Sequence, residues 1–246
     1  MTPELLVINP NTSASVTELV VRHLAPALAP ALAVRAVTAR FGSPYLSDEV
    51  GCAVAGHAVL DAWLHALQST APAPHAVLIA CFGDPGLLAL RECSPVPVSG
   101  LAEAAFQEAA RLGPFAVVTG GERWGPMLQR LAASLGLGDR LAGVHTVAPT
   151  GAQLAADPVA ARALLAQACR TAQQRWGVNS VIVGGAGLAG VAAQLQAQVP
   201  VPLIDSVMAA ARWARALPPP AQAAASVPSA ERLAQLRQAI ALSSLT

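Results

Sequence analysis

The chain has 246 residues, 54% hydrophobic and 12% charged, which is enough for one large α/β domain or two domains of about 120 residues each. Its formal net charge of +1 provides no long-range field that would attract nucleic acid or an anionic membrane surface. All 15 basic residues are arginines. The absence of lysine excludes a Schiff base to pyridoxal phosphate or to a carbonyl substrate, and it excludes the lysine of a Walker-type phosphate loop.

The first residues and the cysteines bear on location and metal binding. The segment 1–13 carries Glu4 and an Asn-Pro turn where a signal peptide needs a basic region followed by an apolar run. We therefore expect a cytoplasmic protein, and no stretch of the sequence predicts a transmembrane span. No metal site is expected either, because the four cysteines form neither a CxxC pair nor a close cluster with histidine: Cys52, Cys81, Cys93 and Cys169.

In chain order, short β-branched runs that end in glycine or asparagine alternate with longer alanine-rich stretches. This alternation is typical of parallel sheets with crossover helices and predicts the α/β class. After the last of these runs, the proline- and alanine-rich segment 217–230 predicts a linker. An amphipathic helix at 231–245 should follow the linker and pack back on the domain. The predicted strands are 5–9, 33–38, 76–81, 115–119 and 180–185.

An internal repeat is the most informative feature of the sequence. Three landmarks recur in the same order about 105 to 110 residues apart: LLVINPN with FAVVTGG, HAVLIACFGDPG with NSVIVGGAGLAG, and SPVPVSGLAEAA with QVPVPLIDSVMAA. Two copies of one α/β unit would bring equivalent strand ends to a shared cleft. In this alignment Cys81 corresponds to Gly185, so only the first copy places a thiol at the cleft.

Cys81 is the candidate catalytic residue. It ends an apolar strand and is followed by Phe82-Gly83-Asp84, so it should lie at a carboxyl strand end next to the start of a helix. Backbone amides at a helix start lower the pKa of a thiol, and a thiolate can remove a proton from carbon. The structural alternative is a buried cysteine that only fills space.

Polar and glycine residues at the other strand ends are candidates for substrate binding. The run after the first strand offers amides, hydroxyls and carboxamides, although the same residue types also cap helices. A Thr-Gly-Gly turn occupies the equivalent place in the second copy. The predicted substrate-binding residues are Asn9, Asn11, Thr12, Ser13, Phe82, Gly83, Thr119, Gly120, Gly185 and Ala186.

A dinucleotide site is a competing interpretation of the second copy. Gly185, Gly187 and Gly190 form a GxGxxG pattern after a strand, and Asp205 follows at the spacing of a ribose-binding acid. The pattern has no counterpart in the first copy, and only a short tail follows it. His57 lies on a helical stretch and is read as a surface histidine.

These motifs resemble the aspartate/glutamate/hydantoin racemase superfamily, and most closely its hydantoin (allantoin) racemase branch. The resemblance covers nearly the whole chain. It implies two pseudo-symmetric flavodoxin- or Rossmann-like domains with a cofactor-free site between them. It also implies two cysteines that face the substrate's stereogenic carbon from opposite sides. The motifs that carry it are VINPNTS, IACFGDPGLLALRE, VVTGGERW, GGAGLAG and PVPLIDSV.

Cys81 matches the first cysteine of this family, whereas the second falls on Gly185. The predicted function is a cofactor-independent racemase of a small amino-acid derivative such as a 5-substituted hydantoin, with Cys81 as acid or base. Asp84, His57 or a water could supply the opposite proton. One alternative is a decarboxylase similar to the arylmalonate decarboxylases, with Cys81 as sole proton donor. The other is a relative that binds a small molecule without catalysis.

The repeat and the resemblance together predict the domain division. One domain comprises 1–98 and 207–246, and the other comprises 99–206. The family and the hydrophobic composition predict a homo-oligomer of unspecified size. The expected partner is a small-molecule substrate, without nucleic acid, membrane, metal or cofactor.

Overall fold

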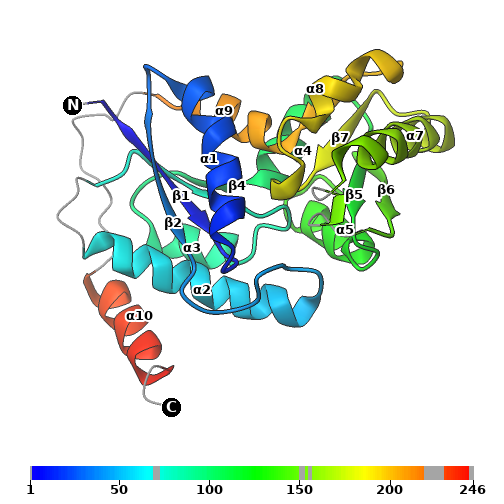
Figure 1. Ribbon diagram of the computed structural model, residues 1–246. Coiled ribbons are helices and arrows are strands. Elements are labelled where there is room, and N and C mark those ends of the chain that lie inside the picture. The colour runs from blue at the N-terminus through cyan, green and yellow to red at the C-terminus, as the bar shows by residue number, and fades with distance from the viewer. Residues whose placement is uncertain (1, 69–72, 150–152, 155–156, 219–229, 244–246) are drawn as a thin grey trace.

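The computed structural model describes residues 2–68, 73–149, 153–154, 157–218 and 230–243. Two parallel sheets of four strands each form the frame of the molecule (Figure 1). The α/β class with two parallel-sheet units is thereby confirmed. The predicted linker at 217–230 falls mostly outside the described residues.

The first sheet has the order β2-β1-β3-β4. Its central strands are β1 and β3, and all side chains of β3 are buried because helices cover both faces. The β4 strand was expected only as a landmark of the repeat, since three residues give no periodic pattern. The strands are β1 (Glu4–Asn9), β2 (Ala33–Thr38), β3 (Ala76–Ile79) and β4 (Val98–Gly100).

The second sheet repeats this arrangement in the order β6-β5-β7-β8, so the repeat in the sequence is a repeat in space. The sequence did not predict β6, whose apolar residues are interrupted by Gly143 and His145. It pairs with β5 through a register shift at Phe115 and Ala116. The strands are β5 (Phe115–Gly120), β6 (Leu141–Val147), β7 (Ser180–Gly184) and β8 (Leu203–Asp205).

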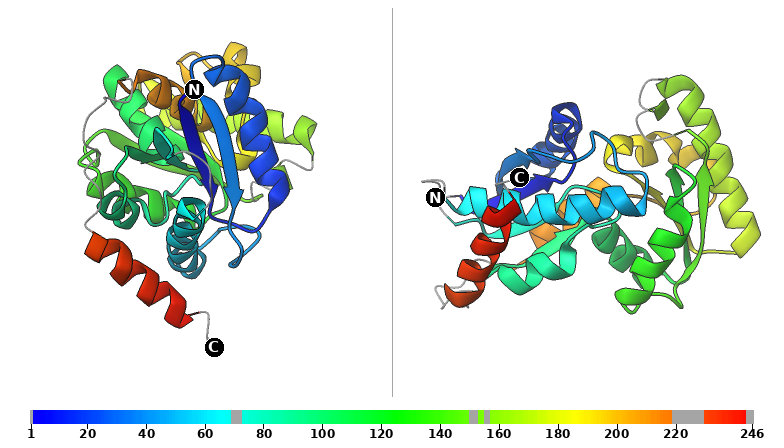
Figure 2. Two further views of the ribbon diagram at one scale, coloured as in Figure 1. Left: turned by 90° about the vertical axis from the view of Figure 1, so that its left-hand side faces the viewer. Right: turned by 90° about the horizontal axis from the view of Figure 1, so that it is seen from below.

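Helices cover the sheets and join the two halves (Figure 2). The helices α4 and α9 each follow the last strand of a sheet, pack against each other, and α9 also contacts α1. The α-helices are α1 (Ala14–Leu28), α2 (Glu49–Leu67), α3 (Leu87–Cys93), α4 (Leu101–Leu112), α5 (Trp124–Ser134), α7 (Pro158–Trp176), α8 (Val191–Leu195), α9 (Ser206–Ala216) and α10 (Ala230–Ser243). Two 3-10 turns are η1 (Ala186–Leu188) and η2 (Gln196–Gln198).

The long helix α2 and the helix α10 lie on the same side of the first sheet (Figure 1). By length and composition α2 is apolar enough to cross a membrane, but half of its most apolar window is buried inside the protein, as in an ordinary core helix. The terminal helix α10 lies beside α2 (Figures 1 and 2), and residues of both helices line a shallow hollow that includes Asp61, His65 and Arg237.

The core is continuous between the two halves. Phe82, from the loop after β3, meets Phe106 of α4 edge to face with ring centroids 6.0 Å apart. Phe106 in turn contacts Phe115 of β5 at 5.6 Å. This row of aromatic rings runs from the first sheet to the second, and burial of such large side chains stabilises their junction. The loop that follows Cys81 is therefore anchored in both halves.

Candidate active site

A cavity of about 480 Å3 opens between the carboxyl ends of the two sheets. This volume is in the range that small-molecule sites occupy. The loops after β1, β3, β5 and β7 contribute to its walls, together with one face of α1 and the segment 44–46. The cleft expected from the repeat therefore exists, and Cys81 lies in its wall.

The structure brings most of the predicted site residues together. Three of them do not line the cavity, namely Asn9, Thr12 and Gly83. The other predicted residues do: Cys81, Asn11, Ser13, Phe82, Thr119, Gly120, Gly185 and Ala186.

Asn9 lies behind the cavity and shapes the loop in front of it. Its amide nitrogen donates to the Asn11 side chain at 3.0 Å, to the Ser13 carbonyl at 3.0 Å and to the Thr17 hydroxyl at 2.9 Å. The Asn11 side-chain oxygen also accepts from the Ser13 amide at 2.9 Å. Because Asn9 is fully buried and its amide nitrogen donates to this loop and to Thr17 of α1, it positions Asn11 and Ser13 at the cavity.

Cys81 is held in a tight turn that buries its thiol. Its carbonyl accepts from the amides of Gly83 at 3.1 Å and Asp84 at 3.2 Å. Burial raises the pKa of the thiol well above its usual value, with smaller contributions from Cys52 and Asp84. The sequence predicted a lowered pKa, but the next helix starts only at Leu87, so desolvation outweighs any helix-terminus effect.

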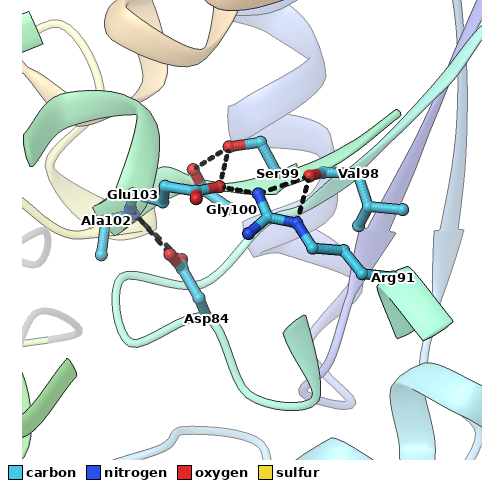
Figure 3. A network of polar contacts seen from close by, with 7 residues as sticks. All are labelled: Asp84, Arg91, Val98, Ser99, Gly100, Ala102 and Glu103. Carbon is cyan, nitrogen blue, oxygen red and sulfur yellow. Dashed lines mark hydrogen bonds and ion pairs between the residues drawn. The ribbon is translucent and has the colours of Figure 1, made fainter. Parts of the chain in front are cut away.

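Asp84, three residues after Cys81, belongs to a buried polar network (Figure 3). Its carboxylate accepts from the amides of Ala102 at 3.0 Å and Glu103 at 2.7 Å, at the start of α4. Glu103 pairs with Arg91 and accepts from the Ser99 hydroxyl at 2.8 Å. Burial raises the pKa of Asp84 to about 7, although the two amide hydrogen bonds oppose this shift. The network ties the Cys81 loop to α4.

Cys81 is the only cysteine among the described residues that lines the cavity, and the loop after β7, which is equivalent to the Cys81 loop, presents Gly185. Gly185 has φ +143°, a conformation that side chains rarely adopt, and its amide donates to the Ser206 hydroxyl at 3.3 Å. Neither Asp84 nor His57 lines the cavity, and His57 contacts the Phe41 ring. These two side chains are therefore not placed to act as the opposite acid or base.

The glycine-rich turn of the second half is not arranged as a dinucleotide site. The Asp205 carboxylate accepts from the amide of Gly190 at 2.6 Å, and from those of Val207 at 2.9 Å and Met208 at 3.1 Å. The acid that a ribose would need thus caps α9 and holds the turn. Residues 185–188 instead form one wall of the cavity.

Sequence reasoning missed two aromatic residues and one face of a helix. Tyr45 precedes α2 in an irregular segment, and Trp124 begins α5. Ser15, Glu18 and Arg22 reach the cavity mouth from α1. The serine, glutamate and arginine follow helical spacing, which was a usable signal once the preceding loop was assigned to the site. Nothing local in the sequence distinguished Tyr45.

Comparison with known proteins places the chain in a class. The family model described as Asp/Glu/Hydantoin racemase matches residues 5–214. The chain therefore belongs to the Asp/Glu/hydantoin racemase family. The predicted racemase class of enzyme, an isomerase acting on amino-acid derivatives, is confirmed with it. The roles of individual residues remain predictions.

Within this family, the chain is similar to hydantoin and allantoin racemases. The hydantoin racemase of Paenarthrobacter aurescens is 34% identical over 87% of this chain and 90% of that protein. The crystal structure of allantoin racemase from Pseudomonas fluorescens superposes with a TM-score of 0.82 at 30% identity, covering 87% of this chain and 90% of that one. A structure of arylmalonate decarboxylase shares only the fold, with a TM-score of 0.56 at 18% identity over 86% of this chain and 90% of that one.

Proposed function

We propose that this chain racemises a small cyclic amino-acid derivative such as a 5-substituted hydantoin without a cofactor, using Cys81 as its only side-chain acid or base. The observation that carries the proposal is the position of Cys81 in the wall of a cavity formed by both halves. The relatives named hydantoin racemase and allantoin racemase support this substrate class.

Polar groups beside Cys81 suit a ring that carries carbonyl and amide groups. Thr119 is 4% exposed and lines the cavity, and its hydroxyl has no hydrogen-bond partner among the described residues. The Thr119 hydroxyl is not among the fully buried unpaired side-chain atoms, so it is open to the cavity and can bind a substrate carbonyl or amide. Asn11 and Ser13 contribute further polar groups from the first half. We assign these three residues to substrate binding.

The chemistry follows from one thiol and one open face. The carbonyl next to the α-carbon acidifies its proton, and transfer of that proton to the Cys81 thiolate leaves an enolate. Gly185 has no side chain on the other side, so water delivers a proton there and gives the opposite enantiomer. The thiol then returns its proton to solvent. A raised pKa makes the thiolate the minor form at neutral pH, so its scarcity limits the rate.

Exchange of the α-proton in deuterated water tests this function. We expect wild type to exchange deuterium into single enantiomers of 5-substituted hydantoins, with racemisation at the same rate or slower. Cys81→Ala should do neither. Gly185→Cys, which adds a thiol on the open face, should raise the ratio of racemisation to exchange. Undiminished exchange in Cys81→Ala would refute the assigned role of Cys81.

The raised pKa of Cys81 also favours a second function, a decarboxylase of the lyase class. A thiol that stays protonated is a suitable donor to an enolate formed by loss of carbon dioxide. Such an enzyme would release carbon dioxide from an α-aryl or α-amino malonate and place one solvent deuterium in a single enantiomer. If the protein racemises and exchanges the hydantoin but releases no carbon dioxide from the malonates, the decarboxylase function is contradicted.

A silent exchange assay with measurable hydantoin binding would contradict the proposed function. A homo-oligomeric assembly, a cytoplasmic location and the division into domains 1–98 with 207–246 and 99–206 stay predictions. Analytical ultracentrifugation tests the first of these directly.

A further inference from the structure

Two aromatic rings cross between the halves, and both rest on glycines. Phe82 of the first half packs on Gly184, where a Cβ would lie 2.6 Å from Cδ1 of the ring. Trp124 of the second half packs on Gly83, where a Cβ would lie 2.7 Å from Cη2. Both rings line the cavity. The walls next to the thiol are therefore aromatic.

The two rings differ in what holds them. Phe82 is wedged against Phe106 in the row of rings that joins the sheets, so its removal would open the core. Trp124 is 5% exposed and rests on Gly83 and on Gly121, where a Cβ would lie 3.2 Å from its Cδ1. Because glycines form these two surfaces, no side chain there can swing in to refill the space if the indole is truncated.

A substrate that gives its α-proton to Cys81 must place that carbon about 3.5 Å from the sulfur. The substituent on the same carbon then lies one bond away, against the wall beside the thiol. Trp124 forms part of that wall and contacts the residue two places after Cys81. Its indole is thus in a position to limit how large the substituent can be.

We propose that Trp124 is a specificity-determining residue that limits the size of the substituent on the reacting carbon, and that Gly83 is kept free of a side chain so that the indole can lie back from the cavity. The inference rests on the proposed function, since it refers to the substrate's α-carbon. It adds a substrate property, the bulk of the substituent, that the family likeness does not specify.

Opposite substitutions give opposite expectations. Trp124→Leu enlarges the cavity and should raise the ratio of kcat/KM for 5-benzylhydantoin to that for 5-methylhydantoin at least tenfold, within the range that a few methylene-sized volumes provide. Gly83→Ala places a methyl group against the indole, pushes the ring into the cavity, and should lower the same ratio. Gly83 has no positive φ, so the alanine adds no backbone strain of that kind.

The double variant makes the test specific. In Gly83→Ala with Trp124→Leu the new methyl group meets no indole, so the effect of the alanine on the ratio should largely vanish. Trp176 and Gly143 provide a matched control, because a Cβ at position 143 would lie 2.8 Å from Cη2 of Trp176 and neither residue lines the cavity. Trp176→Leu and Gly143→Ala should lower stability and leave the ratio within twofold of wild type.

Calorimetric binding of the same two hydantoins separates the two proposals. If wild type binds both but racemises neither, the proposed function fails, and Trp124→Leu should still shift the binding ratio towards the benzyl compound. A ratio that Trp124→Leu leaves unchanged in both assays, or changes no more than Trp176→Leu does, overturns the specificity proposal. If neither compound binds, both proposals fail together.

Discussion

The loops after β3 and β7 occupy equivalent places in two sheets of the same strand order, yet they are built differently. In the first half the carboxylate belongs to the loop, since Asp84 reaches the start of α4. In the second half it belongs to the strand end, since Asp205 reaches back to Gly190 and forward to α9. The two loops at the cleft are therefore each held by a buried carboxylate, which comes from the loop itself in the first half and from the end of the neighbouring strand in the second.

The position of the Asp84 carboxyl group explains why residue 100 is a glycine. A Cβ at Gly100, the counterpart of Asp205, would lie 2.7 Å from Cβ of Asp84, whose carboxyl group fills that space. The consequence for the cleft is an asymmetric environment. The first loop holds a buried acid with a raised pKa behind a buried thiol, whereas the second presents a glycine with positive φ. Similar folds thus give the two faces of the cleft different chemistry.

The largest expected effect concerns the thiol itself. Cys81→Ala should lower the rate of α-proton exchange by about 10² to 10⁴, the usual contribution of a positioned acid or base. Cys169→Ala is the matched control, because Cys169 is also buried but packs in the core of the second half. It should retain the wild-type rate per folded molecule. Comparable losses in the two variants would mean that Cys81 is only a core residue.

The pH dependence of the rate distinguishes a base from a donor. Burial raises the pKa of Cys81 well above its usual value, so the thiolate fraction grows about tenfold for each pH unit up to that pKa. For racemisation, kcat/KM corrected for the uncatalysed reaction should therefore rise with a slope near one between about pH 7 and 9. Proton donation in a decarboxylase needs the thiol, so the profile over this range should be flat or fall.

Asp84 should make the folded protein less stable as the pH rises. Its pKa is about 7 in the fold, against about 4 for an unfolded chain. Between these values the folded state holds a proton that the unfolded state has lost, so the free energy of unfolding falls with increasing pH. The loss amounts to about 2 to 3 kcal/mol from pH 5 to pH 8.

Urea unfolding at several pH values measures this linkage, and Asp84→Asn should remove most of the slope in that range. Asp61→Asn, at the partly exposed Arg40 ion pair, serves as the comparison and should leave the slope in place. An unchanged slope in Asp84→Asn would show that another group titrates. If Asp84→Asn retains exchange activity at pH 6, the negative charge of Asp84 is not needed for α-proton exchange.

Much of this arrangement followed from local sequence. The β-branched runs located the strands around Cys81 and Thr119, and the repeat placed both at one cleft. The pKa of Cys81 was predicted in the wrong direction, because the burial that raises it depends on packing between segments distant in sequence, which no local pattern reveals. The sequence did not predict Trp124 as a site residue, because its contact with Gly83 joins positions about 40 residues apart.

The smallest effect concerns the face opposite the thiol. Substituting Gly185, which has φ +143°, by cysteine or alanine should cost about 1 to 2 kcal/mol of stability, because a side chain strains this backbone. A Cβ there would have ordinary contacts with Leu188 at 3.5 Å, so the cost arises from conformation and not from a clash. Ala186 also lines the cavity and lacks a positive φ. Ala186→Cys should therefore add a thiol at less cost in urea unfolding, and equal losses for the two cysteine variants would show that Gly185 relaxes to accept a side chain.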